Sequence, residues 1–237
     1  MTLWAVVLLL AVTLVAAFVQ GVSGLGFALV VAPVAGLLQP GLLPVALLVL
    51  MLPLNAYVAW RERHHLDLRG AGWITVARVV ATPAGIALLA VLSERALGLL
   101  IGVSTIIAAL VSLRAPAFRP SRPAYAAAGV VTGLSETATG IGGPPLALVY
   151  QHRPAPELRA TIALCFLVGE IVSLAGLALS DRLAGPGLAA SVWLMPAVLV
   201  GTALSSLLHH RVGGAKLRMG VLGFAIASGV LLLATSL

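Results

Sequence analysis

The chain has 237 residues, of which 61% are hydrophobic and 9% are charged. A typical soluble domain is about 45–50% apolar and about 25% charged, so an ordinary soluble enzyme, a nucleic-acid-binding domain and a disordered protein are excluded. The composition predicts an all-α polytopic membrane protein. One spanning helix needs roughly 20 apolar residues, so the chain has room for about seven or eight membrane elements and for no soluble domain.

Polar breaks divide the first half into apolar segments. We expect Phe27–Leu38 to be too short to span a bilayer, and it follows a glycine-rich stretch, Gly21–Gly26. The first apolar segment is interpreted as a retained membrane helix, because no basic region precedes it as in a signal peptide. The other predicted segments are Leu3–Gln20, Gly41–Trp60, Ala71–Leu92 and Ala96–Leu113.

The second half repeats this plan after a proline-rich stretch, residues 114–123, that predicts a linker. A short apolar segment, Ala124–Leu134, precedes the glycine-rich stretch Ser135–Pro145 and another short segment, Leu146–Gln151. Residues 124–151 are too few for two full spans, so they predict a re-entrant hairpin or two short broken helices. Three predicted spans follow: Ala160–Leu179, Leu188–Leu208 and Met219–Leu237.

The two halves also match residue by residue. Gly21–Val30 matches Gly140–Val149 at five of ten positions, and Trp73–Thr82 matches Trp193–Thr202 at four of ten, at offsets of 119 and 120 residues. Internal duplication is common in transporters. We therefore expect a first membrane repeat over residues 1–113 and a second over 124–237, joined by a cytoplasmic linker.

The basic residues predict that the repeats are inverted. Cytoplasmic loops of membrane proteins are enriched in Lys and Arg. The loops at equivalent positions of the two repeats differ in charge, so they face opposite sides. Each repeat then has a broken or re-entrant helix pair plus three spanning helices, with both chain termini outside. Eleven basic residues lie in loops 61–70, 114–123, 152–159 and 209–218, against two in turns 93–95 and 180–187.

The glycine-rich stretches are the predicted substrate site. Bare backbone at membrane depth is tolerated only where it faces protein or a water-filled cavity, and the N-terminus of a helix that follows such a break attracts anions. The alternative is that the glycines only permit close helix packing. The candidate substrate-binding residues are Gly21, Ser23, Gly24, Gly26, Ser135, Thr137, Thr139, Gly140, Gly142, Gly143 and Pro144.

Three ionisable residues, Arg78, Glu136 and Glu170, lie within or between apolar segments, where charges are costly and usually functional. Glu136 falls in the second glycine-rich stretch and is the first candidate for proton coupling, with Glu170 as the second. Arg78 is a candidate for binding the anion or for holding a glutamate. The alternative is a structural pair of Arg78 with either glutamate. Gln20 and Asn55 are interpreted as helix-to-helix hydrogen bonds.

Other candidate residues do not indicate a metal, a cofactor or an enzyme. The histidine pairs His64–His65 and His209–His210 fall in loops and lack a metal-ligand spacing. Cys165 is interpreted as inert packing. The sequence contains neither a G-x-x-x-x-G-K-[ST] nucleotide-binding loop nor a G-x-S-x-G nucleophile motif.

The two glycine-rich stretches, GVSGLGFALVVAP (21–33) and GLSETATGIGGPPLALVY (133–150), resemble the duplicated signature of the sulfite exporter TauE/SafE family. The resemblance implies a carrier in the bacterial inner (cytoplasmic) membrane that moves sulfite, sulfoacetate or other organosulfonates. SETAT, which contains Glu136, departs from the small residues expected there and marks a point where substrate or coupling can differ. The residues carried over from the family motifs are Gly21, Ser23, Gly24, Gly26, Gly140, Gly142, Gly143 and Pro144.

We therefore expect a secondary transporter that moves a small anion, such as sulfite, an organosulfonate or a related organic acid, across the lipid bilayer. Protons are the expected coupling ion and sodium is the alternative. No nucleic-acid partner is expected, and a homodimer is an open option. The alternative functions are a passive anion channel or facilitator and a membrane-embedded enzyme. The sequence leaves the direction of transport open.

Overall fold

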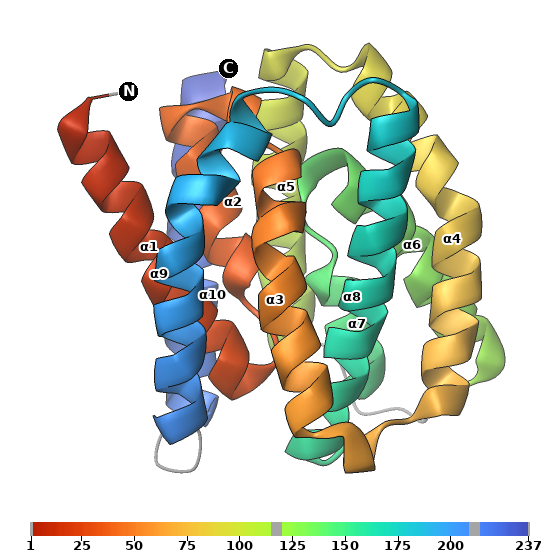
Figure 1. The fold of residues 1–237 in the computed structure, drawn as a ribbon. Coiled ribbons are helices and arrows are strands. Elements are labelled where there is room, and N and C mark those ends of the chain that lie inside the picture. Colours follow the sequence, from red (N-terminus) through yellow and green to blue (C-terminus); the bar gives the residue numbers. More distant parts are fainter. Residues whose placement is uncertain (1, 115–119, 209–213, 237) are drawn as a thin grey trace.

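The chain folds as a bundle of helices in the computed structural model, which describes residues 2–114, 120–208 and 214–236 (Figure 1). These ranges contain α-helices and two short 3-10 turns, Pro40–Leu42 and Arg63–His65, and no strand. The helices are α1 (Leu3–Ser23), α2 (Phe27–Leu38), α3 (Val45–Arg61), α4 (Leu68–Val91), α5 (Glu94–Arg114), α6 (Arg122–Thr139), α7 (Gly143–Tyr150), α8 (Ala155–Leu179), α9 (Pro186–Leu208) and α10 (Gly214–Ser236).

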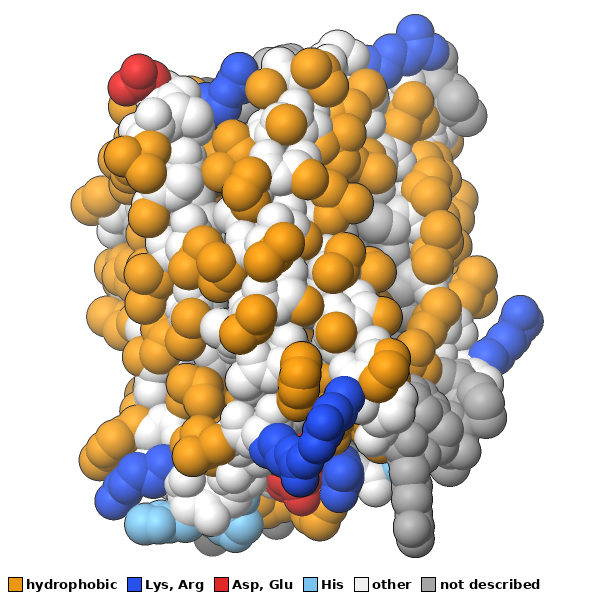
Figure 2. Space-filling model, turned by 90° about the vertical axis from the view of Figure 1, so that its right-hand side faces the viewer, with side chains coloured by type: hydrophobic (Ala, Val, Ile, Leu, Met, Phe, Trp, Pro, Cys, Tyr) orange, Lys and Arg blue, Asp and Glu red, His pale blue; other side chains and the backbone are white. Residues whose placement is uncertain are grey.

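The predicted polytopic membrane class is confirmed. Six helices of the described ranges (α1, α4, α5, α8, α9 and α10) are long and apolar enough to cross a membrane. Figure 2 shows a broad band of hydrophobic side chains around the middle of the molecule, with Lys and Arg side chains at both ends and His side chains at the lower end. An apolar band between charged ends is the surface that a bilayer requires.

The helix ends are sorted between the two ends of the bundle (Figure 1). Helix α1 begins and α10 ends at the upper end, where the α4–α5 and α8–α9 turns also lie. The α3–α4 and α7–α8 connections lie at the lower end. These lower connections and the helix ends beside them carry Arg61, Arg63, Arg69, Arg122, Arg153 and Arg159.

Helices from the two halves of the sequence pack against each other throughout the bundle. Helix α1 packs mainly on α9, while α6 packs mainly on α4. Each short helix also packs on a helix of the other half: α2 packs on α10, and α7 packs on α5. Helices α3 and α8 pack on each other, as do α5 and α10. The two halves are therefore interlocked rather than separate bodies.

Glycines allow the closest of these helix contacts. A Cβ atom added to Gly129 of α6 would collide with the carbonyl oxygen of Ile74 in α4, and one added to Gly133 would lie 2.6 Å from that of Arg78. In α9, a Cβ at Gly201 would meet the carbonyl oxygen of Leu14 in α1. Small residues that let backbones approach are typical of helix association in membranes.

Several predicted boundaries are wrong, and three of them concern the breaks and the start of α3. Helix α1 continues through Ser23 and α6 continues through Thr139, so the interruptions are shorter than the glycine-rich stretches Gly21–Gly26 and Ser135–Pro145. The reason is that a helix in a bilayer retains its internal hydrogen bonds until a residue adopts a conformation that ends it. Helix α3 begins at Val45 rather than Gly41, because Pro40–Leu42 forms a 3-10 turn.

We predict that Gly129→Ala lowers the thermal stability of the detergent-solubilised protein, because the added methyl overpacks the α4–α6 contact at a cost of about 1–3 kcal/mol. Gly72→Ala is the matched control, since nothing lies within 4 Å of a Cβ at this position of α4. The control should unfold at the wild-type temperature or above it, because alanine favours a helix more than glycine does. Equal melting temperatures for the two variants would contradict the close-packing interpretation.

Candidate functional site

The two helix interruptions have the same backbone geometry. Gly24 ends α1 and Gly140 ends α6 in the left-handed conformation, with φ of 84° and 80°. Each glycine N–H donates to the carbonyl oxygen four residues earlier, on Gln20 and Glu136 respectively, at 2.7 Å in both cases. A left-handed residue after a helix usually has to be glycine, because a side chain is disfavoured there. The motif that makes each interruption is therefore [Ser/Thr]-Gly-[Leu/Ile]-Gly.

A hydroxyl group stabilises each interruption in the same way. The hydroxyl of Ser23 donates to the carbonyl oxygen of Val19 and accepts from the N–H of Leu25. The hydroxyl of Thr139 donates to the carbonyl oxygen of Ser135 and accepts from the N–H of Ile141. Both hydroxyls thus satisfy backbone groups that the break leaves without helical partners, which is necessary where no water is available.

This equivalence corrects the register between the halves at the breaks. The structure pairs Gly24 with Gly140, whereas sequence matching pairs Gly21 with Gly140. The second half has three more residues than the first between its break and its short apolar segment, and this difference shifts the register of the sequence match. In the corrected register Gln20 takes the place of Glu136, since each lies one turn before its glycine cap. The sequence match therefore did not reveal that Gln20 is the first-half equivalent of Glu136.

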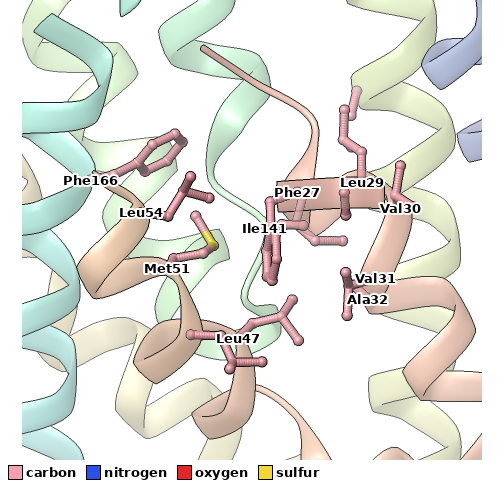
Figure 3. Packing of buried hydrophobic residues seen from close by; sticks show 14 of the residues in the cluster. Phe27, Leu29, Val30, Val31, Ala32, Leu47, Met51, Leu54, Ile141 and Phe166 are labelled. Atoms are coloured by element: carbon pink, nitrogen blue, oxygen red, sulfur yellow. The ribbon is translucent and has the colours of Figure 1, made fainter. Parts of the chain in front are cut away.

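The first break and the residues that directly follow the second break line one cavity. It has a volume of about 80 Å³ and is bounded by Ser23 and Gly26 of the first break and by Gly143 and Pro144 at the start of α7. A cavity that holds one water needs only about 10–15 Å³, so this one has room for several waters or a small ion. Gly143 lies in contact range of Leu25, which shows how closely the breaks approach. Figure 3 shows Phe27, the first residue of α2, and Ile141 of the second break in the same hydrophobic core as Leu47, Met51 and Leu54 of α3.

A charged cluster lies beside the second break, between α4, α6 and α8. Arg78 and Glu136 are both 0% exposed, and the guanidinium Nη2 lies 2.8 Å from the carboxylate Oε1. The Nη1 group of Arg78 donates to the carbonyl oxygen of Cys165 at 2.9 Å. The guanidinium also faces the ring of Phe166, with 5.9 Å between Cζ and the ring centre. It lies directly on Gly169, where any Cβ would collide with it.

Glu136 lies in α6 and not in the second break itself, so the predicted position is wrong by one helical turn. Its carboxylate nevertheless reaches the break, because Oε2 occupies the space where a Cβ on Gly142 would be. Gly142 caps the N-terminus of α7. A carboxylate is favoured at such a position by the helix dipole. Apart from the ion pair with Arg78, the Glu136 carboxylate has no hydrogen-bond partner among the described residues.

Glu170 of α8 is a second fully buried carboxyl that belongs to the same cluster. It lies within electrostatic range of Glu136 and Arg78, and its Oε1 accepts a hydrogen bond from Nδ2 of Asn55 at 2.7 Å. Asn55 Oδ1 in turn accepts from Nε2 of Gln20 at 2.9 Å, which confirms the predicted helix-to-helix hydrogen bond between α1 and α3. Arg78 has Glu136, and not Glu170, as its ion-pair partner.

The remaining candidates lie around these two groups. Thr137 points at α8, with 2.7 Å between its hydroxyl and that of Ser173. Ser135 lines an apolar groove of about 520 Å³ between α5, α6 and α7, away from the charged cluster. Gly21 packs on Ser205 of α9, where a Cβ would collide with the hydroxyl. Close helix packing therefore accounts for Gly21.

An ion-pair network under the first break was not anticipated from the sequence. Arg159 packs on Gly24 through its Cγ and Cα atoms, while its Nε lies 2.9 Å from Glu62 Oε1. Arg61 donates to the carbonyl oxygen of Gly21 at 2.8 Å and pairs with the same glutamate at 3.1 Å. The sequence prediction treats Arg61 and Arg159 only as basic residues of cytoplasmic loops. The acidic Glu62 inside the basic loop 61–70 is the sequence signal for such an ion pair.

The other singled-out residues that the structure describes contribute no side chain to the site. His64 and His65 are exposed, and His209–His210 falls outside the described residues. Cys165 is buried and contributes only its backbone carbonyl to Arg78. Over the described ranges, no group of three or more His, Cys, Asp or Glu residues could hold a metal ion.

We predict that Arg78→Gln destabilises the protein more than the double variant Arg78→Gln/Glu136→Gln does. The single change leaves Glu136 buried without its cation, a loss that typically costs about 3–5 kcal/mol, whereas the double change removes both charges. Thermal unfolding of the two single variants and the double variant in detergent gives the coupling energy. Additive effects would contradict a direct Arg78–Glu136 interaction.

Comparison with known proteins agrees with these features. No match was found among curated proteins or among solved structures. The family model described as "Sulfite exporter TauE/SafE" matches residues 9–232, nearly the whole chain. The match includes both glycine-capped breaks and the charged cluster. The chain therefore belongs to the sulfite exporter TauE/SafE family of membrane transporters.

Proposed function

We propose that this protein is a secondary transporter that moves a small anion (sulfite, an organosulfonate or a related organic acid) together with protons across the bacterial cytoplasmic membrane. Membership of the family supports a membrane transporter for sulfite or another anion. The observation that carries the finer proposal is the buried Arg78–Glu136 pair, whose carboxylate abuts the N-terminal cap of α7 at Gly142.

The position of Glu136 gives a physical reason for coupling. A helix N-terminus beside a guanidinium is a favourable place for one negative charge, and Glu136 occupies it in this structure. A substrate anion and an ionised Glu136 would repel each other at this position. Protonation of Glu136 removes its charge and leaves Arg78 and the backbone of the second break available to the anion. Proton binding and anion binding therefore favour each other.

Glu170 provides a second carboxyl for this exchange. Arg78 balances only one of the two buried carboxylates, and an uncompensated charge in a membrane core is costly. A bound proton offsets the other negative charge, and sodium is the alternative cation. The hydroxyl of Ser23 and the backbone at Gly26 and Gly143 line the cavity and belong to the proposed binding region. The hydroxyls of Thr137 and Thr139 and the backbone at Gly24 and Gly140, which lie outside the cavity lining, complete the proposal at the ends of α1 and α6.

The reciprocal helix contacts and the equivalent breaks support two inverted repeats, 1–113 and 124–237, that are joined by a cytoplasmic linker at 114–123. Each repeat would have three long helices and a broken pair, α1–α2 or α6–α7. The loops of the lower end in Figure 1 are rich in arginine, which favours the cytoplasmic side for this end. Such repeats commonly rock about a central site during transport.

The proposal is tested by flux into proteoliposomes, with sulfite, sulfate, sulfoacetate, taurine and small carboxylates supplied in turn, with and without an imposed proton gradient. We expect saturable uptake of at least one anion that a proton gradient accelerates. In Glu136→Gln the gradient should lose this effect, because the side chain no longer takes up a proton.

Glu157→Gln is the matched control, since Glu157 lies at the start of α8 and faces Arg153 near the surface. This variant should keep the wild-type response to the gradient. Saturable flux that ignores the gradient in the wild-type protein would favour a passive facilitator. The absence of flux for every anion in the panel would overturn the proposed substrate class.

A further inference from the structure

A continuous chain of buried hydrogen bonds connects the first break to the charged cluster at the second break. The N–H of Phe27, the first residue of α2, donates to Gln20 Oε1 at 3.0 Å. Gln20 Nε2 donates to Asn55 Oδ1 at 2.9 Å, and Asn55 Nδ2 donates to Glu170 Oε1 at 2.7 Å. Gln20, Asn55 and Glu170 are at most 2% exposed, so water does not compete with these bonds.

The chemistry of its two ends determines the direction of this chain. A backbone N–H can only donate, so Phe27 requires the oxygen of the Gln20 amide. The Gln20 nitrogen then faces Asn55 and requires the Asn55 oxygen, which leaves the Asn55 nitrogen to donate to Glu170. Glu170 Oε1 must therefore act as an acceptor. No other orientation of the two amides satisfies every group along the chain.

A proton on Glu170 Oε1 reverses these requirements. The protonated oxygen is a donor, so Asn55 must turn its amide and present its oxygen to Glu170. The Asn55 nitrogen then faces Gln20, and Gln20 must turn as well. Two donors, the N–H of Phe27 and the NH₂ of Gln20, would then point at the first break and need an acceptor.

We propose that Gln20 and Asn55 are the residues that couple the proton on Glu170 to anion binding at the first break. The proton turns both amides and creates a two-donor site for an oxyanion beside Gly26, which lines the cavity between the breaks. The linkage is reciprocal, so an anion at this site favours the proton on Glu170. The inference depends on the proposed proton-coupled transport and adds the path by which the coupling acts.

The surroundings of Glu170 are consistent with this role. Arg78 faces it from α4 and Glu136 faces it from α6, while α3 contributes the neutral Asn55. Glu170 Oε2 has no partner among the described residues, so a proton there would be a buried donor without an acceptor, whereas a proton on Oε1 gains the Asn55 oxygen once that amide has turned. Glu136 and Glu170 would thus control different breaks. Glu136 abuts the second break directly, and Glu170 acts on the first through two amides.

The test compares wild-type protein with Gln20→Leu and Asn55→Leu, which remove the amides at similar side-chain size. Gln39→Leu is the matched control, because Gln39 follows α2 at its far end and lies outside the hydrogen-bond chain. The anions of the flux panel serve as probes, and the KM of transport is measured at acidic and alkaline pH. In the wild-type protein and the control, we expect acid to lower KM by about fivefold or more.

In Gln20→Leu and Asn55→Leu we expect downhill flux to continue while the pH dependence of KM falls to that of Glu170→Gln, because only the contribution of Glu170 passes through the two amides. Adding Glu170→Gln to Asn55→Leu should change this pH dependence no further, because both substitutions interrupt one path. A merely structural role for the amides would lower flux at every pH and leave the pH dependence in place, which would overturn the inference.

A second set of variants and a binding measurement keep the test decisive if the leucine variants fail to fold. Gln20→Met and Asn55→Ala are milder replacements that add no titratable group. Neither side chain can donate along the chain, so both should also reduce the pH dependence to that of Glu170→Gln. The stabilisation of each protein by the anion in detergent, followed by thermal unfolding at both pH values, reports binding without transport.

The outcomes separate the two proposals. A wild-type protein whose flux and KM ignore protons would overturn the proposed function, and the coupling path with it. A proton-coupled wild-type protein whose amide variants retain the full pH dependence would overturn the coupling path alone.

Discussion

The bilayer requires every backbone polar group to find a partner inside the protein, and the architecture depends on this constraint. The chain interrupts its helices within the bundle at residues 24–26 and 140–142, and it protects both interruptions in the same way. A left-handed glycine ends the helix, and a serine or threonine hydroxyl accepts the next unpaired N–H. The long helices pack around these breaks and exclude lipid from them, which is the condition under which non-helical backbone is tolerated in a membrane.

The buried charges are the second costly feature, and stability does not explain them. An apolar core of the same volume is often as stable as a buried ion pair, or more stable. This cluster also has one guanidinium for two carboxyls, so it lacks the balance of a purely structural pair. The glycines at positions 142 and 169 give Glu136 and Arg78 the space that they occupy. The chain is thus built to hold charge beside a break in a helix.

The interlocked halves explain how the two breaks can communicate. Helix α3 belongs to the first half and α8 to the second, and the hydrogen bond between Asn55 and Glu170 joins them at the centre of the bundle. Arg78 also comes from the first half, although its ion-pair partner, Glu136, comes from the second. The buried charged and polar groups of the two halves are therefore in direct contact.

The sequence by itself determined the membrane class, the order of the helices, the presence of two glycine breaks and the location of Arg78, Glu136 and Glu170 within the membrane-spanning part of the chain. These follow from composition, from segment length and from the cost of a charge in an apolar segment, which are local properties. The spans were found at nearly the observed positions, and Phe27–Leu38 was found at the observed ends. The family also followed from local motifs, since the residues that make the breaks are contiguous.

Tertiary structure decided the register of the breaks and the partners of the buried polar groups. Which glycine ends each helix depends on a left-handed φ that the neighbouring packing selects, and both stretches offer several glycines. The sequence match therefore paired Gly21 with Gly140 and hid the equivalence of Gln20 and Glu136. Arg78 forms its ion pair with Glu136 rather than with Glu170 because of the way in which α4, α6 and α8 pack together. Hydrogen-bond partners far apart in the chain are brought together only by helix packing, so no local pattern could reveal the path from Phe27 to Glu170.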